Sequence, residues 1–280
     1  MQRDRIRIER ADSVEPDKIR DCLNEAFSDY LIRMPALDAE GWRGFVNRQG
    51  VDISLSRVGL REDRVEAFAL ATARDSKIWR IAVMGARPDL RGTGLAPRLL
   101  DETLDDARSR GLSSVELEVF AQNERAFRLY ESRGMKPVSS LFGYEAVAGR
   151  PGSDVPVQPV TLDRARLRAQ EIERASALPL PWQVGPAAIS RLPGTAQCWQ
   201  HCSAQVVFSE MMGLIHIHSL LDSSTDHHSA AELLGALRAA FPEAVLRAPQ
   251  LQAEHGAAQA FRSAQWTEAA LFQYLMVIRF

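Results

Sequence analysis

Residues 79–97 read WRIAVMGARPDLRGTGLAP, an apolar run that passes through two glycines into a second apolar segment. The run over 78–86 predicts a strand, and the leucines after Gly94 recur at helical spacing as far as Gly111. A turn between a strand and a helix leaves backbone N–H groups without a partner in the helix, and the helix dipole adds positive charge there. We therefore expect an anion-binding turn at residues 91–97.

Two common phosphate-binding loops do not fit this turn. A P-loop requires Gly-Lys followed by Ser or Thr, which the turn lacks. A Rossmann turn requires a third glycine where Pro97 stands, and the strands before the turn have the spacing of an antiparallel meander. The pattern that remains is Arg91-x-x-Gly94-x-Ala96, in which Gly92 and Gly94 would let an anion approach the backbone closely.

A second informative pattern lies about twenty residues further on. Residues 116–135 read ELEVFAQNERAFRLYESRGM. A strand is expected to end near Phe120, Asn123 stands at a helix N-cap position, and Gly134 follows the end of that helix. Asn123 could cap the helix, bind a ligand or do both. Tyr130 could be a buried aromatic residue of an amphipathic helix or a proton donor, since a phenol is protonated at pH 7.

Together the two patterns resemble those of the GNAT acyltransferases. That family carries Arg/Gln-x-x-Gly-x-Gly/Ala between a strand and a helix, and then an Asn followed by Leu-Tyr-x-x-x-Gly-Phe. Met135 replaces the final aromatic residue here. The resemblance covers residues 1–148, and it implies an α+β fold with a mixed, mostly antiparallel central sheet flanked by helices.

The resemblance also implies a reaction and a set of site residues. An amine would attack the thioester of acetyl-CoA directly, without an acyl-enzyme and without a metal. Backbone groups of residues 84–86 would hold the pantetheine arm, the glycine turn would hold the pyrophosphate, and Tyr130 would protonate the CoA thiolate. The implied cofactor-binding residues are Met84, Gly85, Ala86, Arg91, Gly92, Thr93, Gly94, Leu95, Ala96, Pro97, Asn123 and Phe127.

The general base is less evident, because the strand at 78–86 contains no acid where many relatives place a glutamate. Glu118, on the next strand, is the residue we expect to act as the base. The alternatives are Glu116, Glu66 and Asp29, and each of these carboxylates could equally be a solvated surface charge.

The composition of the chain changes at residues 149–156, which are rich in proline and glycine. We expect a first domain over 1–149, a linker over 150–156 and a second domain over 157–280. The order of strands and helices after the break repeats the order before it. However, the turn at 222–229 reads DSSTDHHS, has no glycine and carries two acids that would repel pyrophosphate. We therefore expect a degenerate GNAT-like domain that has lost CoA binding.

The second half also contains metal-ligand residue types, namely Cys198, His201 and Cys202, with His216 and His218 further on. Their spacing matches no standard zinc finger, and strand alternation puts both cysteines on the face opposite His201. We expect ordinary strand residues and no metal site.

Composition bounds the possible partners and the location. The 280 residues carry 34 basic and 36 acidic side chains, so the net charge of −2 argues against nucleic acid as a partner. No apolar run approaches the ~18 residues of a membrane span. The first residues lack the apolar core of a signal peptide, and three cysteines are too few for a disulfide framework. These features favour a cytoplasmic protein.

Two functions remain open from the sequence. The leading hypothesis is an N-acetyltransferase whose partners are acetyl-CoA, CoA and an unidentified amine, either a small molecule or a peptide, acting as a monomer or homodimer. The alternative is a non-catalytic acyl-CoA-binding or scaffold protein on the same fold.

Overall fold

The computed structural model describes residues 6–148, 152–176 and 179–280, which form two compact units. Unit 1 consists of residues 6–118, 123–136 and 276–280 of the described chain, and unit 2 consists of 119–122 and 137–275, apart from the gaps. The first residues of the expected linker, together with residue 149, lie outside the described residues.

Unit 1 contains the strand at 78–86, the helix after Gly94, the strand that ends at Phe120 and the helix after Asn123, as the sequence predicted. Its strands β1 to β5 pair in sequence order, antiparallel up to β4, and β5 runs parallel to β4. The strands are β1 (Arg7–Arg10), β2 (Asp52–Arg61), β3 (Arg64–Ala73), β4 (Ile78–Ala86) and β5 (Ser114–Phe120). The helices are η1 (Ala11–Ser13), α1 (Pro16–Ala26), α2 (Ala39–Gln49), η2 (Pro88–Leu90), α3 (Leu95–Ser109) and α4 (Glu124–Ser132).

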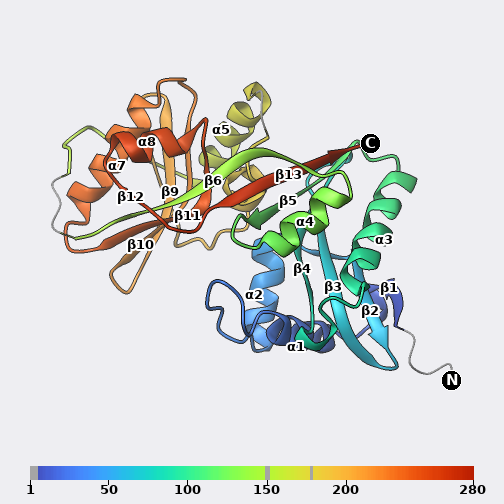
Figure 1. Ribbon diagram of the computed structural model, residues 1–280. Coiled ribbons are helices and arrows are strands. Elements are labelled where there is room, and N and C mark those ends of the chain that lie inside the picture. The colour runs from blue at the N-terminus through green and yellow to red at the C-terminus, as the bar shows by residue number, and fades with distance from the viewer. Residues whose placement is uncertain (1–5, 149–151, 177–178) are drawn as a thin grey trace. The chain divides into compact units, whose positions relative to one another are not determined.

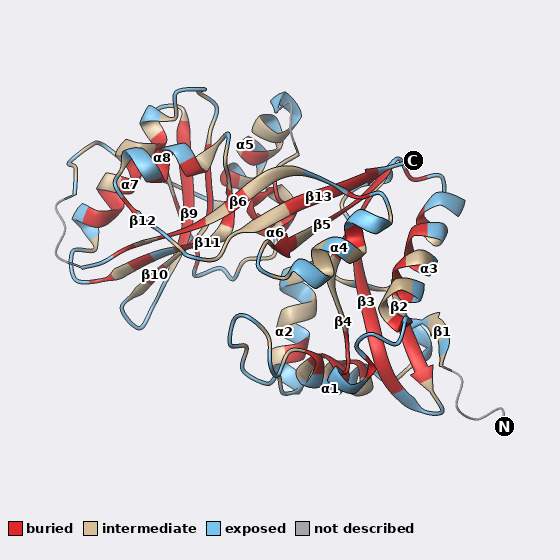
Figure 2. Ribbon diagram, viewed as in Figure 1, coloured by how far each residue is buried: buried red, intermediate tan, exposed pale blue. Residues whose placement is uncertain are grey.

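The core of unit 1 forms on both faces of β3, which is buried along nearly its whole length (Figure 2). Phe68 and Leu70 pack with α1, whereas Ala67 and Ala69 pack with Leu99 of α3. Small residues on one face and large ones on the other let a long helix approach the sheet closely on one side only. This packing fixes α3, whose first turn follows the glycine turn.

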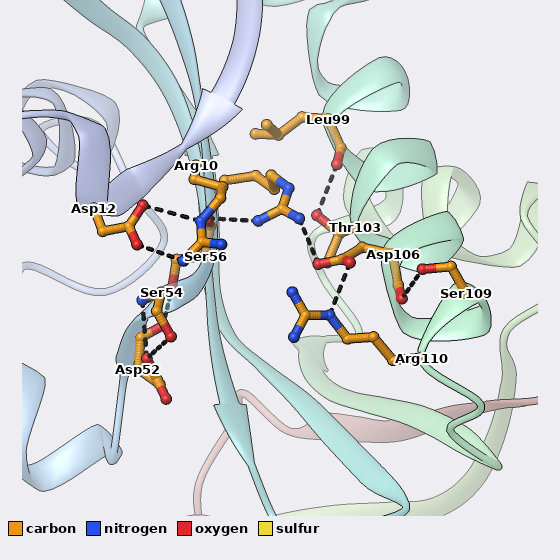
Figure 3. Close-up of polar contacts among 11 residues, drawn as sticks. Arg10, Asp12, Asp52, Ser54, Ser56, Leu99, Thr103, Asp106, Ser109 and Arg110 are labelled. Atoms are coloured by element: carbon orange, nitrogen blue, oxygen red, sulfur yellow. Dashed lines mark hydrogen bonds and ion pairs between the residues drawn. The ribbon is translucent and has the colours of Figure 1, made fainter.

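Polar contacts fix α3 against β2 as well. Asp106 of α3 pairs with Arg57 of β2, and its other oxygen accepts from Arg110 Nε at 2.8 Å (Figure 3). Within the helix, Thr103 donates to the Leu99 carbonyl, as serine and threonine do when buried in a helix. The helix that follows the glycine turn is therefore anchored by apolar and ionic contacts together.

A divergence of two strands creates the opening needed for a ligand. The pairing of β4 with β5 covers Ile78–Ile81 and Ser114–Leu117. The rest of β4, from residue 82 to residue 86, continues beyond this ladder, so its backbone edge on the β5 side is left for other partners.

Unit 2 repeats the element order of unit 1. Its sheet runs β7-β8-β9-β10-β11-β6, antiparallel except where β11 runs parallel to β10. The strands are β6 (Lys136–Ala146), β7 (Gln158–Val160), β8 (Gln197–His201), β9 (Ala204–Met211), β10 (Leu214–Asp222), β11 (Val245–Ala253), β12 (Thr267–Glu268) and β13 (Gln273–Arg279). The helices are α5 (Leu162–Ala175), η3 (Trp182–Val184), α6 (Pro186–Ile189), α7 (His228–Ala240) and α8 (Ala257–Ser263).

The last strand of each repeat belongs to the other unit, so the units do not divide where the sequence suggested. Most of β6 lies in unit 2, where it pairs with β11. Its Tyr144 stacks on Phe261 with ring centroids 4.8 Å apart, and the Tyr144 hydroxyl donates to Glu268 at 3.0 Å. Residues 276–280 of β13 lie in unit 1, where Phe280 N donates to the Ser113 carbonyl at 3.0 Å.

This exchange explains the difference from the expected boundary at 149–157. The residues of β6 were expected to lie in the first domain, 1–149. They form one strand whose buried residues Leu141, Tyr144 and Ala146 face unit 2 partners. A local sequence pattern predicts a strand but does not name the strand beside it.

No helix in the described chain has the length and apolar character to cross a membrane.

Candidate active site

A pocket of about 360 Å³ in unit 1 brings both sequence patterns together. Its walls are the end of β4, the glycine turn with the start of α3, and one face of α4. The lining residues are Met84, Gly85, Ala86, Arg91, Gly92, Gly94, Ala96, Pro97, Asn123, Arg125, Ala126, Leu129 and Tyr130.

The first wall is the edge of β4 beyond its pairing with β5. Gly85 lies there against tightly packed side chains: an added Cβ would meet Phe68 Cζ at 3.0 Å and Ala26 Cβ at 3.2 Å. A larger residue would push the strand toward the pocket. The backbone of residues 84–86 is thus held in place while its edge can hydrogen-bond an extended ligand.

The second wall is the turn before α3 (Figure 1). Gly92 and Gly94 have φ values of 87° and 86°, which side-chain-bearing residues adopt only with strain. Gly94 is the N-cap residue of α3, and an added Cβ there would meet nothing within 4 Å. The N–H groups of Leu95 and Ala96 have no acceptor within the helix, and Pro97 occupies a position where no N–H is needed. These features make a cradle for an anion.

Arg91 lines the pocket but is also bound to the end of α1. Its two terminal nitrogens each lie 2.6 Å from a carboxylate oxygen of Asp29, and Nη2 donates to the Ala26 carbonyl at 2.8 Å. The Asp29 carboxylate raises the pKa of Arg91, and Arg91 holds the pKa of Asp29 below its usual value. The guanidinium is therefore fixed in direction before any ligand arrives.

The third wall is the face of α4. Asn123 caps the helix, its Oδ1 accepting from Ala126 N at 3.2 Å, as the sequence allowed. Tyr130 is 8% exposed, and burial raises the pKa of its phenol above the usual value. Tyr30 interacts with both residues. Its side chain hydrogen-bonds with Asn123, and its charge when ionised would raise the pKa of Tyr130 further.

Every carboxylate considered as a general base pairs with an arginine. Glu118, the expected base, lies 2.8 Å from Arg80 Nη2 and does not line the pocket. Glu116 lies 2.6 Å from Arg74. Glu66 and Asp29 have arginine partners of their own, Arg87 at 3.4 Å and Arg91 at 2.6 Å. None of the described residues that line the pocket is a carboxylate.

Most of the expected cofactor-binding residues line the pocket, but Thr93, Leu95 and Phe127 do not. Thr93 donates its hydroxyl to the Leu90 carbonyl, and Leu95 is buried in the core of unit 1. Sequence reasoning missed Arg125, Ala126 and Leu129. Helical spacing could have found Ala126, because it lies three residues after Asn123 and four before Tyr130.

The corresponding turn of unit 2 is closed by its own acids. Asp222 accepts from Ala230 N at 3.0 Å and from Ser224 N at 2.9 Å, and Asp226 accepts from His228 N at 3.0 Å. These carboxylates occupy the start of α7, where unit 1 has an open helix terminus. A phosphate would meet negative charge and N–H groups that are already bound.

The metal-ligand residue types of unit 2 have other partners. The Nδ1 atom of His201 lies 2.8 Å from the Pro156 carbonyl, and its Nε2 atom lies 3.1 Å from Glu232. Cys198 is buried, which raises the pKa of its thiol to about 12. Among the described residues, no group of three or more histidine, cysteine or acidic side chains is arranged to hold a metal ion.

Comparison with known proteins matches residues 18–135 to the model of the "Acetyltransferase (GNAT) family". These residues form a GNAT domain. The match contains both sequence patterns and most of the pocket, so the resemblance predicted from the sequence is confirmed.

Two curated relatives match parts of the GNAT domain. A mycothiol acetyltransferase of Beutenbergia cavernae is 43% identical over 65 residues, which is 23% of this chain and 22% of that protein. A ribosomal protein bS18-alanine N-acetyltransferase of Salmonella typhimurium is 34% identical over 89 residues, 31% of this chain and 58% of that protein. The matched segments therefore cover less than two thirds of either relative.

The likeness of fold extends beyond the GNAT domain to unit 2. A tandem GNAT protein from the clavulanic acid biosynthesis pathway matches 98% of this chain and 98% of its own, with a TM-score of 0.63 and 13% identity. Likeness at this identity is likeness of fold. The prediction of two GNAT-like domains with mixed sheets is confirmed.

Proposed function

We propose that the protein transfers an acetyl group from acetyl-CoA to a primary amine in the pocket of unit 1. The observation that carries this proposal is the convergence of two distant sequence patterns on one pocket of about 360 Å³. The free edge of β4 suits the amides of pantetheine, the glycine turn suits the pyrophosphate, and Asn123 and Tyr130 face the same space.

The reaction needs a nucleophile, an electrophile and an acid. The neutral amine attacks the thioester carbonyl, the carbon–sulfur bond breaks, and the departing CoA thiolate takes the proton of the Tyr130 hydroxyl. Burial keeps that phenol protonated at physiological pH. None of the described residues that line the pocket is a carboxylate, so the proton of the attacking nitrogen passes to water, and water returns a proton to the Tyr130 phenolate.

Acetyl-CoA binding is tested by titration calorimetry with wild type and two variants that carry the same strain. Gly94→Glu places a carboxylate in the open space of the pocket. Gly111→Glu places the same side chain after the end of α3, away from the pocket lining. Both glycines have positive φ and no atom within 4 Å of an added Cβ, so both variants cost about 1–2 kcal/mol of backbone strain. We expect one site per chain, lost only in Gly94→Glu.

Other outcomes would change the proposal in defined ways. Two sites per chain would mean that unit 2 binds acetyl-CoA despite its acidic turn. Absence of binding in wild type would refute the cosubstrate. Turnover is then measured as release of free thiol with a panel of amines that includes a cysteinyl amine and a peptide with N-terminal alanine. Binding without turnover on any of them would favour the non-catalytic alternative.

A further inference from the structure

Unit 2 has a pocket of its own where unit 1 has its proposed acetyl-CoA site. In unit 2 the described pairing of β10 with β11 covers Leu214–His216 and Val245–Arg247, and the pocket lies where the two strands continue past this ladder. It measures about 130 Å³ and is lined by the ends of β10 and β11, the starts of α7 and α8, and the segment after α5. The divergence of strands is thus retained in unit 2, but the chemistry around it differs.

The walls of this pocket are mostly aliphatic. Leucines of both strands line it together with residues that follow α5: Leu180, Val184, Leu220, Leu221 and Leu251. Its volume is close to that of an engineered apolar cavity of about 150 Å³ that binds benzene. The pocket therefore suits a compact apolar body and is far too small for a CoA nucleotide.

The titratable groups that line it are one carboxylate and two imidazoles, beside the neutral polar side chains of Ser139, Ser176 and Gln252. Asp222, His227 and His255 are the titratable lining residues, and no lysine or arginine is among the described residues that line the pocket. Asp222 accepts two backbone N–H groups, but a carboxylate has capacity for further donors. This arrangement favours a cation over an anion.

His227 provides a second observation that points to a ligand. Its Nδ1 atom is buried and has no hydrogen-bond partner among the described residues. Buried polar atoms without a partner cost free energy, so a hydrogen-bonding ligand beside His227 would recover it.

We propose that this pocket binds a small primary amine with a compact apolar body. The ammonium group would lie between Asp222 and the imidazoles, and the hydrocarbon would contact the leucine walls. Unit 2 would then be an amine-binding domain rather than a remnant without a ligand. This inference concerns binding in unit 2 and does not depend on acetyl transfer in unit 1.

The test uses three ligands of similar shape and different charge: cyclopentylamine, cyclopentanol and cyclopentanecarboxylate. Binding to the full chain is measured by ligand-observed NMR and calorimetry at pH 7.5, where the amine carries its charge. We expect the amine to bind about tenfold more tightly than the carboxylate, with the alcohol between them. Equal or tighter binding of the carboxylate would overturn the proposal, as would absence of amine binding.

Two variants locate the bound amine. Ala257→Leu fills part of the pocket from the first turn of α8, whereas Gln259→Leu adds the same side chain to an exposed position of that helix outside the pocket. The amine should be lost from Ala257→Leu and retained by Gln259→Leu. Binding that survives Ala257→Leu, in a variant whose melting temperature matches that of Gln259→Leu, would place the amine elsewhere, for example in unit 1, and refute the assignment. If Ala257→Leu fails to fold, Leu251→Phe serves as the pocket-filling variant with the same expectations.

Discussion

At the scale of single residues, Tyr130 combines burial with a place in the pocket lining. Its pKa is raised by desolvation, so the phenol remains a proton donor over the whole range in which an amine acceptor can be tested. A proton donor to the leaving thiolate acts on the chemical step and contributes little to binding of acetyl-CoA.

We therefore expect Tyr130→Phe to lower kcat by about 10²-fold, within the usual range for a general acid, while the Kd for acetyl-CoA stays within a factor of about two. Stopped-flow or steady-state thiol release measures the first quantity and calorimetry the second. The phenylalanine keeps the packing of α4, so loss of both activity and binding would instead assign Tyr130 a structural role.

The expected pH dependence of the reaction is based on the described residues that line the pocket, none of which is a carboxylate. If water accepts the proton of the amine, kcat/KM should rise about tenfold per pH unit until the pKa of the acceptor is reached. Tyr130 should cause no fall in kcat/KM below about pH 10. The pKa of its phenol is raised, so the protonated form is lost only above the ordinary pKa of tyrosine. A plateau starting near pH 6 would reveal a protein base.

Glu118→Gln tests the same question from the protein side. The carboxylate and its partner Arg80 are both nearly fully buried, with side-chain exposures of 3% and 1%. Removing the negative charge breaks this buried ion pair, and such a loss typically costs about 3–5 kcal/mol of stability. We expect a lower melting temperature and an unchanged pH–rate profile per folded molecule. A normal melting temperature with a flattened pH profile would restore Glu118 as the base.

At the scale of elements, the end of α1 and the residues just after it contact all three walls of the pocket. Asp29 and the Ala26 carbonyl bind Arg91 of the glycine turn, and Ala26 also packs against Gly85 of β4. Tyr30 continues the contact to the N-cap of α4 through Asn123. One short segment thus sets the positions of β4, the turn and α4 relative to one another within unit 1.

A double-mutant cycle tests whether Asp29 acts through Arg91. Asp29→Asn should weaken acetyl-CoA binding about two- to fivefold, the range expected for a partly exposed ion pair. In an Arg91→Gln background the same change should have no further effect. The exposed pair of Asp105 with Arg108 gives a matched control, since Asp105→Asn removes the same charge away from the pocket. Additive effects of Asp29→Asn and Arg91→Gln would show that Asp29 acts independently.

The elements of the site could be foreseen from the sequence to different degrees. The turn around Gly94 and the cap at Asn123 follow from residues adjacent in the chain, so local rules predicted both. The pairs Glu118–Arg80 and Asp29–Arg91 join residues 38 and 62 positions apart. No local rule names such partners, and the expected base was chosen without knowledge that an arginine already neutralises it.

At the scale of the whole molecule, the two repeats exchange their last strands: most of β6 belongs to unit 2, and the last residues of β13 belong to unit 1. Residues 276–278 of β13 are buried in unit 1, and Ile278 contacts Gly134 after α4. Burial of each such apolar side chain contributes about 1.5–3 kcal/mol. The second domain expected from the sequence, 157–280, included this strand, because its place in the first unit depends on contacts across most of the sequence.

Deletion of residues 276–280 should therefore destabilise unit 1, although the pocket residues are all retained. We expect the loss of acetyl-CoA binding and of the cooperative thermal transition. The free energy that burial of these apolar side chains contributes is comparable to the total stability of a domain. Ile278→Ala is a milder version and should cost about 2–5 kcal/mol. Arg279→Ala, an exposed neighbour, is the control. Wild-type affinity in the deleted chain would show that unit 1 does not need β13.

The strand exchange also has a consequence for synthesis. A ribosome that has translated the glycine turn, Asn123 and Tyr130 has already made every residue that lines the proposed active site. Yet the neighbour of β5 is residues 276–280, which leave the exit tunnel only after unit 2 has been translated. Until then the nascent chain exposes the edge of β5, an open partner for chaperones or for a neighbouring chain on the same polysome. Acetyl-CoA affinity should accordingly appear after, and not during, translation of residue 280.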